Sequence, residues 1–106
     1  MTEADLSKYF WLAKEIEAIE KELEATYTNI EVAGRRELIL KEKMKDAAKE
    51  LLIIEDFLDG LDDPEMRLIF RMRYCLRMTW EAIGSEIYMS PSGALRKCKR
   101  FLKKNF

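Results

Sequence analysis

Six basic side chains near the C-terminal end of this chain have the type and spacing needed to bind a polyanion. Arg96 and Arg100 are four residues apart and therefore lie on the same side of a helix. An arginine guanidinium can donate two hydrogen bonds to the O6 and N7 atoms of a guanine in the DNA major groove. Lysines bind phosphate, which gives affinity and salt dependence without sequence preference. The candidate DNA-binding residues are Thr79, Ser90, Ser92, Arg96, Lys97, Lys99, Arg100, Lys103 and Lys104.

The helix predicted over residues 90–106 separates apolar from basic side chains. At 100° per residue, both arginines and Lys103 lie opposite the apolar side of this helix. Ser90 is a favourable N-cap, and Pro91 fits the first helical position, where its missing N–H is not needed. The alternative interpretation is that the cations only solubilise the helix and offset its C-terminal dipole. The side chains predicted on the buried side are Ala94, Leu95, Cys98, Phe101 and Leu102, with the terminal Asn105 beside them.

A shorter helix and a tight turn are predicted directly before it, which is the outline of a helix-turn-helix. Thr79 can cap the shorter helix, and Gly84 provides the small side chain needed where two helix backbones approach. Ile83 and Ile87 share the face that points into the core, and a three-residue turn over 88–90 follows. The second helix of this motif usually reads the DNA major groove, so double-stranded DNA is the predicted partner.

The helix-turn-helix must be positioned by the remaining elements, and residues 1–60 predict two long antiparallel helices. Apolar side chains recur alternately three and four residues apart in both helices, as in a coiled coil. Gly34 is the predicted helix-ending residue at the reversal, which is expected over 31–36. The first apolar seam comprises Tyr9, Leu12, Ile16, Ile19, Leu23, Thr26 and Ile30. The second seam comprises Leu40, Met44, Ala47, Leu51, Ile54 and Leu58.

Further apolar side chains widen each long helix's apolar arc beyond one seam. Phe10 and Trp11 do so in the first helix, and Leu52 and Ile53 do so in the second. This surface needs a cover, and a second copy of the hairpin forming a four-helix bundle is the favoured interpretation. The protein is therefore predicted to be a homodimer through residues 1–60. The alternative is that the hairpin packs only on its own C-terminal domain.

A third predicted helix connects the hairpin to the helix-turn-helix. Asp63 is an acidic N-cap, Pro64 follows it, and the apolar residues from Met66 to Tyr74 form a core face. The segment 59–61 is too short for a flexible linker. The predicted fold class is all-α, with a helical hairpin over 1–60, a three-helix helix-turn-helix domain over 61–106, and breaks near 31–36, 59–63, 76–79 and 88–90.

The formal net charge of −1 conceals two halves of opposite charge. Residues 1–60 contain 9 Lys+Arg and 15 Asp+Glu, whereas residues 61–106 contain 10 and 5. An acidic half joined to a basic half suits a protein that places only one end on a polyanion.

The composition argues against several other functions. The chain has no histidine and no CxxC pair, so no metal site is expected and the commonest general base is missing. Without a Gly-rich phosphate loop or an activated nucleophile, we expect no enzyme activity, no cofactor and no small-molecule substrate. Cys75 and Cys98 are expected to be reduced and to pack as small apolar side chains. No run of 18 apolar residues exists and the first residues are acidic, so neither a membrane span nor a signal peptide is expected.

Three motifs in the second half of the chain match a known pattern. They are Arg73-Tyr74 at a helix end, Thr79-Trp80-Glu81 with Ile83, and the Ser90-capped last helix. With them, residues 61–106 resemble region 4 of sigma-70-type factors. The stretch Leu61-Asp62-Asp63-Pro64-Glu65-Met66-Arg67 is similar to small phage regulators of the sigma-region-4-like class, which also carry a long charged helical segment before the motif. The resemblance implies transcriptional control in a phage or prophage, by promoter binding or by contact with RNA polymerase, in the cytoplasm of a bacterial host.

The chain departs from the family pattern in the turn and in the last helix. Tyr88 stands where the family commonly has Gly or Asn, which adopt a left-handed conformation at little cost, so an altered turn is expected. Gly93 lies inside the last helix, and Ala94 replaces a larger aliphatic residue.

Two other functions fit the same pattern. One is a protein-interaction module with little direct DNA contact, in which the C-terminal domain docks on RNA polymerase or the hairpin captures a partner helix. The other is a phage packaging adaptor similar to a terminase small subunit, which also joins a helix-turn-helix to an oligomerising helical part.

Overall fold

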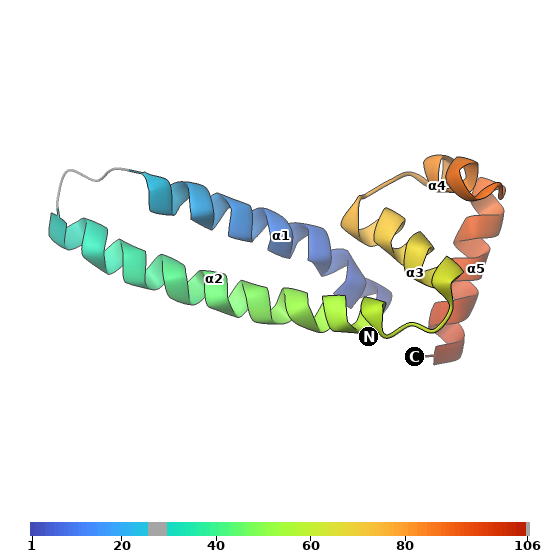
Figure 1. The fold of residues 1–106 in the computed structure, drawn as a ribbon, viewed down its shortest axis with the longest axis horizontal. Helices are drawn as coiled ribbons and strands as arrows, with labels where there is room; N and C mark the ends of the chain where they lie inside the picture. Colours follow the sequence, from blue (N-terminus) through green and yellow to red (C-terminus); the bar gives the residue numbers. More distant parts are fainter. Residues whose placement is uncertain (26–29, 106) are drawn as a thin grey trace.

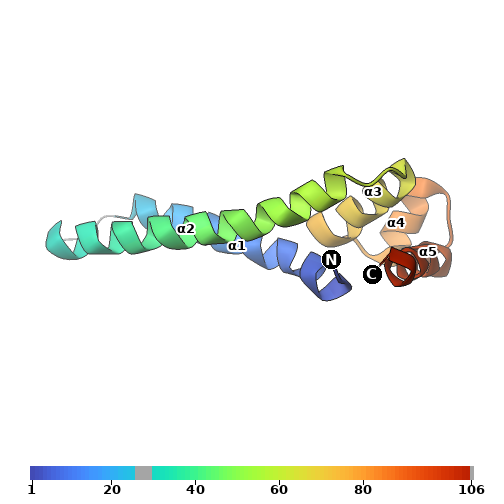
Figure 2. The same ribbon diagram turned by 90° about the horizontal axis from the view of Figure 1, so that it is seen from below.

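The computed structural model describes residues 1–25 and 30–105, and this part of the chain is helical with no strand (Figure 1). The predicted all-α fold class, with a long N-terminal helical hairpin, is confirmed. Figures 1 and 2 show the two long helices side by side and the shorter helices gathered at one end, close to the N-terminus. The elements are α1 (Glu3–Glu24), α2 (Ile30–Asp59), α3 (Pro64–Phe70), the π-helical turn η1 (Arg71–Cys75), α4 (Trp80–Ile87) and α5 (Pro91–Asn105).

The hairpin seam follows the predicted spacing along most of its length. Leu12 and Ile19 of α1 are buried, and all six predicted seam residues of α2 are buried or half-buried. The end of the first seam is wrong, because Ile30 begins α2 and its side chain is 88% exposed. Thr26 lies outside the described residues.

The predicted reversal at Gly34 is also wrong. Gly34 lies inside α2, and no atom beyond its chain neighbours and the nearby helix backbone lies within 4 Å of the place where its Cβ would be. A glycine in an exposed helix position costs about 1 kcal/mol relative to alanine, and a helix of 30 residues tolerates that cost. The chain therefore does not reverse within 31–36, since α1 ends at Glu24 and α2 begins at Ile30. The other three predicted breaks agree with the gaps between α2 and α3, between η1 and α4, and between α4 and α5.

A cluster of ionic and hydrogen-bonding side chains joins the hairpin to the C-terminal helices. Arg71 of η1 lies 2.6 Å from a carboxylate oxygen of Glu55 and 2.8 Å from one of Asp59, both on α2. The hydroxyl of Tyr9 on α1 donates a hydrogen bond to the other oxygen of Glu55. The hydrogen bond from Arg71 lowers the pKa of the Glu55 carboxyl group. Arg77, between η1 and α4, makes a second contact with the hairpin, since its guanidinium lies 4.3 Å from the centre of the Phe10 ring on α1.

The C-terminal helices and the start of α1 share one apolar core. Leu6 of α1 is fully buried in it, together with Phe70, Ile83 and Ala94. Both thiols are free, and burial raises the pKa of Cys98 to about 11. The Cys98 thiol is therefore protonated at neutral pH and acts as a small apolar side chain, as expected.

Candidate nucleic-acid interface

The close approach of α4 and α5 depends on Gly84. A Cβ atom on Gly84 would lie 2.3 Å from the carbonyl oxygen of Met89, a distance that no pair of non-bonded atoms tolerates. The hydroxyl of Thr79 accepts a hydrogen bond from the amide of Ala82 at 3.1 Å, as expected for an N-cap. Glycine and threonine therefore have the roles predicted for them in the helix-turn-helix.

The turn between α4 and α5 keeps a left-handed residue although that residue is a tyrosine. Tyr88 has φ 57° and ψ 43°, and its side chain is 98% exposed. The amide of Met89 donates a hydrogen bond to the carbonyl oxygen of Gly84 at 2.9 Å. The expected altered turn is thus wrong. The tyrosine adopts the conformation that glycine or asparagine takes more easily, at a cost of about 1–2 kcal/mol.

The exposed face of α5 carries most of the candidate DNA-binding side chains. Ser90 is the N-cap, because its hydroxyl accepts a hydrogen bond from the amide of Gly93 at 3.0 Å. Ala94 and Cys98 are buried on the opposite face, with Leu95, Phe101 and Leu102 half-buried beside them. The side chain of Asn105 lies outside the described residues. The exposed polar side chains brought together on α5 are Ser92, Arg96, Lys99, Arg100, Lys103 and Lys104.

Lys97 does not share that outward face. Its ammonium nitrogen lies 2.5 Å from a carboxylate oxygen of Glu65 on α3, and the side chain is only 35% exposed. The prediction that Lys97 is free for phosphate therefore needs correction. Its position on α5, between the buried and exposed sides, directs it towards α3.

Arginines before the motif have partners within the protein. Arg67 donates to the carbonyl oxygen of Leu61 at 2.6 Å, and Arg73 donates to that of Met78 at 2.9 Å. Arg73 also lies 4.7 Å from the centre of the Trp80 ring. Sequence spacing alone did not identify these contacts, since a basic side chain on a helix has the same pattern whether it binds phosphate or a carbonyl group.

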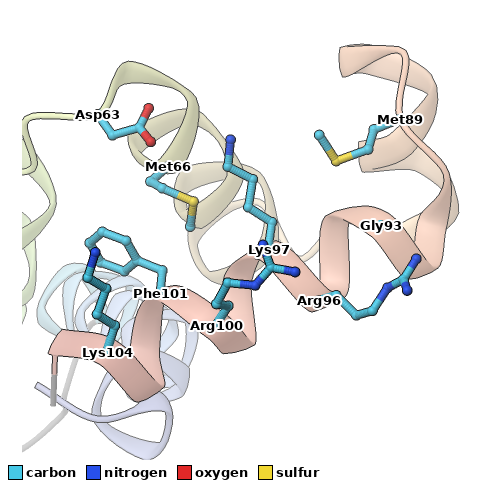
Figure 3. Close-up of a pocket in the computed structure, with 9 residues that line it drawn as sticks. All are labelled: Asp63, Met66, Met89, Gly93, Arg96, Lys97, Arg100, Phe101 and Lys104. Carbon is cyan, nitrogen blue, oxygen red and sulfur yellow. The ribbon is translucent and has the colours of Figure 1, made fainter.

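An open groove of about 620 Å³ runs along one flank of α5, between this helix, the N-terminal end of α3 and the turn at Met89 (Figure 3). We call it the α3–α5 groove. Its apolar lining comes from the half-buried Met89 and Phe101 and from Met66, whose side chain is buried. Its other lining residues are Asp63, Gly93, Arg96, Lys97, Arg100 and Lys104. The sequence pattern separates these apolar and basic residues by face, and it does not predict a groove where the two faces meet.

Comparisons with known proteins give no family for the chain: no protein-family model, curated protein or solved structure matches it. Among residues 1–25 and 30–105, no helix is both long and apolar enough to cross a membrane. Within the same ranges, no three acidic, cysteine or histidine side chains come together as a metal site would require.

Proposed function

We propose that this protein is a DNA-binding transcriptional regulator of phage or prophage origin, which places α5 in the major groove of promoter DNA. One observation carries the proposal. The second helix of a tight helix-turn-helix presents its exposed arginines and lysines on the side opposite its apolar contacts. A helix with this arrangement presents a basic surface to DNA while its other side holds it on the protein.

Each exposed side chain of this interface has a proposed role. Arg96 and Arg100 contact base edges, because both are exposed and stand one helical turn apart. Lys99, Lys103 and Lys104 contact phosphates and supply affinity that depends on salt. Ser92 is exposed in the first turn of α5, where hydroxyl groups commonly donate to phosphate oxygens. Thr79 and Ser90 act mainly through their helix caps.

The proposal predicts two classes of variant. Arg96→Ala and Arg100→Ala should each weaken binding to a cognate promoter site by roughly 1–3 kcal/mol and leave the fold intact. Lys103→Ala and Lys104→Ala should weaken binding to all sequences alike and reduce the salt dependence of the binding constant. Fluorescence anisotropy on promoter fragments from the same genome, at several salt concentrations, measures both effects.

Lys45→Ala is the matched control, since it removes one exposed positive charge from α2, outside the helix-turn-helix. It should leave DNA binding unchanged. Equal binding by the unaltered protein and the Arg96→Ala/Arg100→Ala double variant at every salt concentration would contradict the proposal. Protein contacts, with RNA polymerase or in a packaging complex, would then be the better explanation, and a pull-down scored for DNA and polymerase would separate them.

A further inference from the structure

The α3–α5 groove has an apolar lining that DNA does not cover well. Met89 of the turn and Phe101 of α5, both half-buried, give it accessible apolar surface, and Met66 of α3 lines it from a buried position (Figure 3). Phosphate and sugar groups bind charged and polar surfaces, whereas an apolar lining is stabilised by apolar side chains that remove it from water. Methionine side chains are flexible and polarisable, so they adapt to the shape of an incoming side chain. The lining therefore favours a partner that presents apolar side chains.

The charges around the same groove favour an acidic partner. Arg96, Lys97, Arg100 and Lys104 line it with four positive charges, and Asp63 contributes one negative charge. Lys97 is paired with Glu65, which leaves three lining cations with no carboxylate partner among the ion pairs of the described residues. A partner with carboxylates on both sides of an apolar stripe matches this arrangement.

The length of the groove suits a short helix. Its lining residues on α5 extend from Gly93 to Lys104, which corresponds to roughly 17 Å at 1.5 Å per residue. About three turns of a partner helix cover that distance. An amphipathic helix laid in an apolar groove with one apolar side chain per turn is a common mode of protein recognition.

We propose that the α3–α5 groove binds an acidic amphipathic helix of a protein partner, and that this helix and DNA exclude one another. The exclusion follows because Arg96 and Arg100 line the groove and also belong to the outward face of α5. The exclusion rests on the proposed DNA-binding function, whereas the docking of the helix does not. The same two arginines then respond to two competing anionic partners.

The test uses the full chain and a fluorescent synthetic peptide of about 14 residues, with leucines on one helical face and glutamates beside them. A scrambled peptide of the same composition controls for charge. The amphipathic peptide should bind the protein. The scrambled peptide should bind at least about tenfold more weakly, because it cannot place its leucines on one helical face. Unlabelled peptide should release a promoter fragment from the protein in the same titration.

Matched variants separate the two partners. Met89→Gln changes the groove without changing charge and should weaken the peptide about tenfold while DNA affinity stays within about twofold. Lys99→Ala lies on α5 but does not line the groove, so it should weaken DNA and leave the peptide unchanged. Arg96→Ala should weaken both. Asp63→Asn keeps an N-cap on α3, removes the groove's negative charge and should strengthen the peptide about twofold.

The outcomes distinguish the docking of the helix from the proposed DNA binding. Equal binding of the ordered and scrambled peptides, or Met89→Gln and Asp63→Asn both without effect on the peptide, would overturn the groove as a helix site. Peptide binding with no DNA binding by any variant would leave the groove in place and refute the DNA function. Simultaneous binding of peptide and DNA would refute the exclusion.

Discussion

The backbone of Tyr88 is in the left-handed conformation, which is unfavourable for a residue with a Cβ atom. Its side chain makes little contact with the rest of the protein. Its φ is 57° and 98% of its surface is exposed. Replacing it with glycine should remove the steric cost of the left-handed conformation while losing little packing. We expect Tyr88→Gly to raise the free energy of unfolding by about 1 kcal/mol, measured by denaturant titration.

Tyr88→Ala is the control for this prediction. Alanine removes the ring but keeps the Cβ that makes the left-handed conformation costly, so its stability should stay close to that of the unaltered protein. An equal gain from both substitutions would show that the tyrosine ring, not its backbone, is responsible.

At the scale of single residues, the roles that depend on near neighbours were predictable from the sequence. Gly84, Thr79 and Ser90 act within a few residues of their own positions, where the chemistry of caps and close backbones is local. The partner of Lys97 lies 32 residues away in the sequence, and those of Arg71 lie 16 and 12 residues away, so no local pattern shows them.

At the scale of elements, Glu55 connects both helices of the hairpin to η1. It accepts hydrogen bonds from Tyr9 and Arg71, and its side chain is only 22% exposed. We expect Glu55→Gln to lower the free energy of unfolding by about 1 kcal/mol at neutral pH, because the amide replaces the charged acceptor of Arg71. The exposed carboxylate Glu50, changed to Gln, is the control on the same helix and should have little effect.

The difference in stability between the unaltered protein and Glu55→Gln should depend on pH. The pKa of Glu55 is lowered in the folded protein from the usual 4.5, mainly by the hydrogen bond from Arg71. The stabilisation is therefore fully present above pH 4.5 and is lost as the pH falls through the lowered value. Urea titrations of the unaltered protein and Glu55→Gln should converge in acid. A difference that stays constant with pH would contradict the ionic origin.

The type and length of the elements were more predictable than their ends. The periodic apolar residues of α2 indicate a helix, but Gly34 carries no sign of whether it ends one helix or lies inside another. The π-helical turn η1 was not predicted from the sequence. In the structure, the amide of Leu76 donates a hydrogen bond to the carbonyl oxygen of Arg71, five residues earlier. A π-turn of five residues has no apolar periodicity of its own that would distinguish it from an α-turn in the sequence.

At the scale of the whole molecule, the hairpin exposes apolar side chains that its own C-terminal helices do not cover. Leu6 is buried by them, whereas Trp11, Leu52 and Ile53 are 65%, 56% and 63% exposed. We expect the protein to form a homodimer through residues 1–60, with a mass near twice 12.6 kDa in sedimentation equilibrium at micromolar concentration.

A double variant tests where the two copies meet. Leu52→Ser/Ile53→Ser should shift the dimer towards monomer, because each serine removes apolar surface from the predicted contact. A mass of 12.6 kDa for the unaltered protein, independent of concentration, would rule the dimer out.

The length of the hairpin has a consequence for how the protein moves through solvent. The molecule measures 56 × 25 × 19 Å, and its radius of gyration is 17.9 Å, against about 13 Å for a compact chain of this length. Such a rod experiences more friction than a sphere of equal mass. It therefore leaves a sizing column early even as a single chain. An early elution volume is then explained by the length of the hairpin and does not by itself give the number of chains.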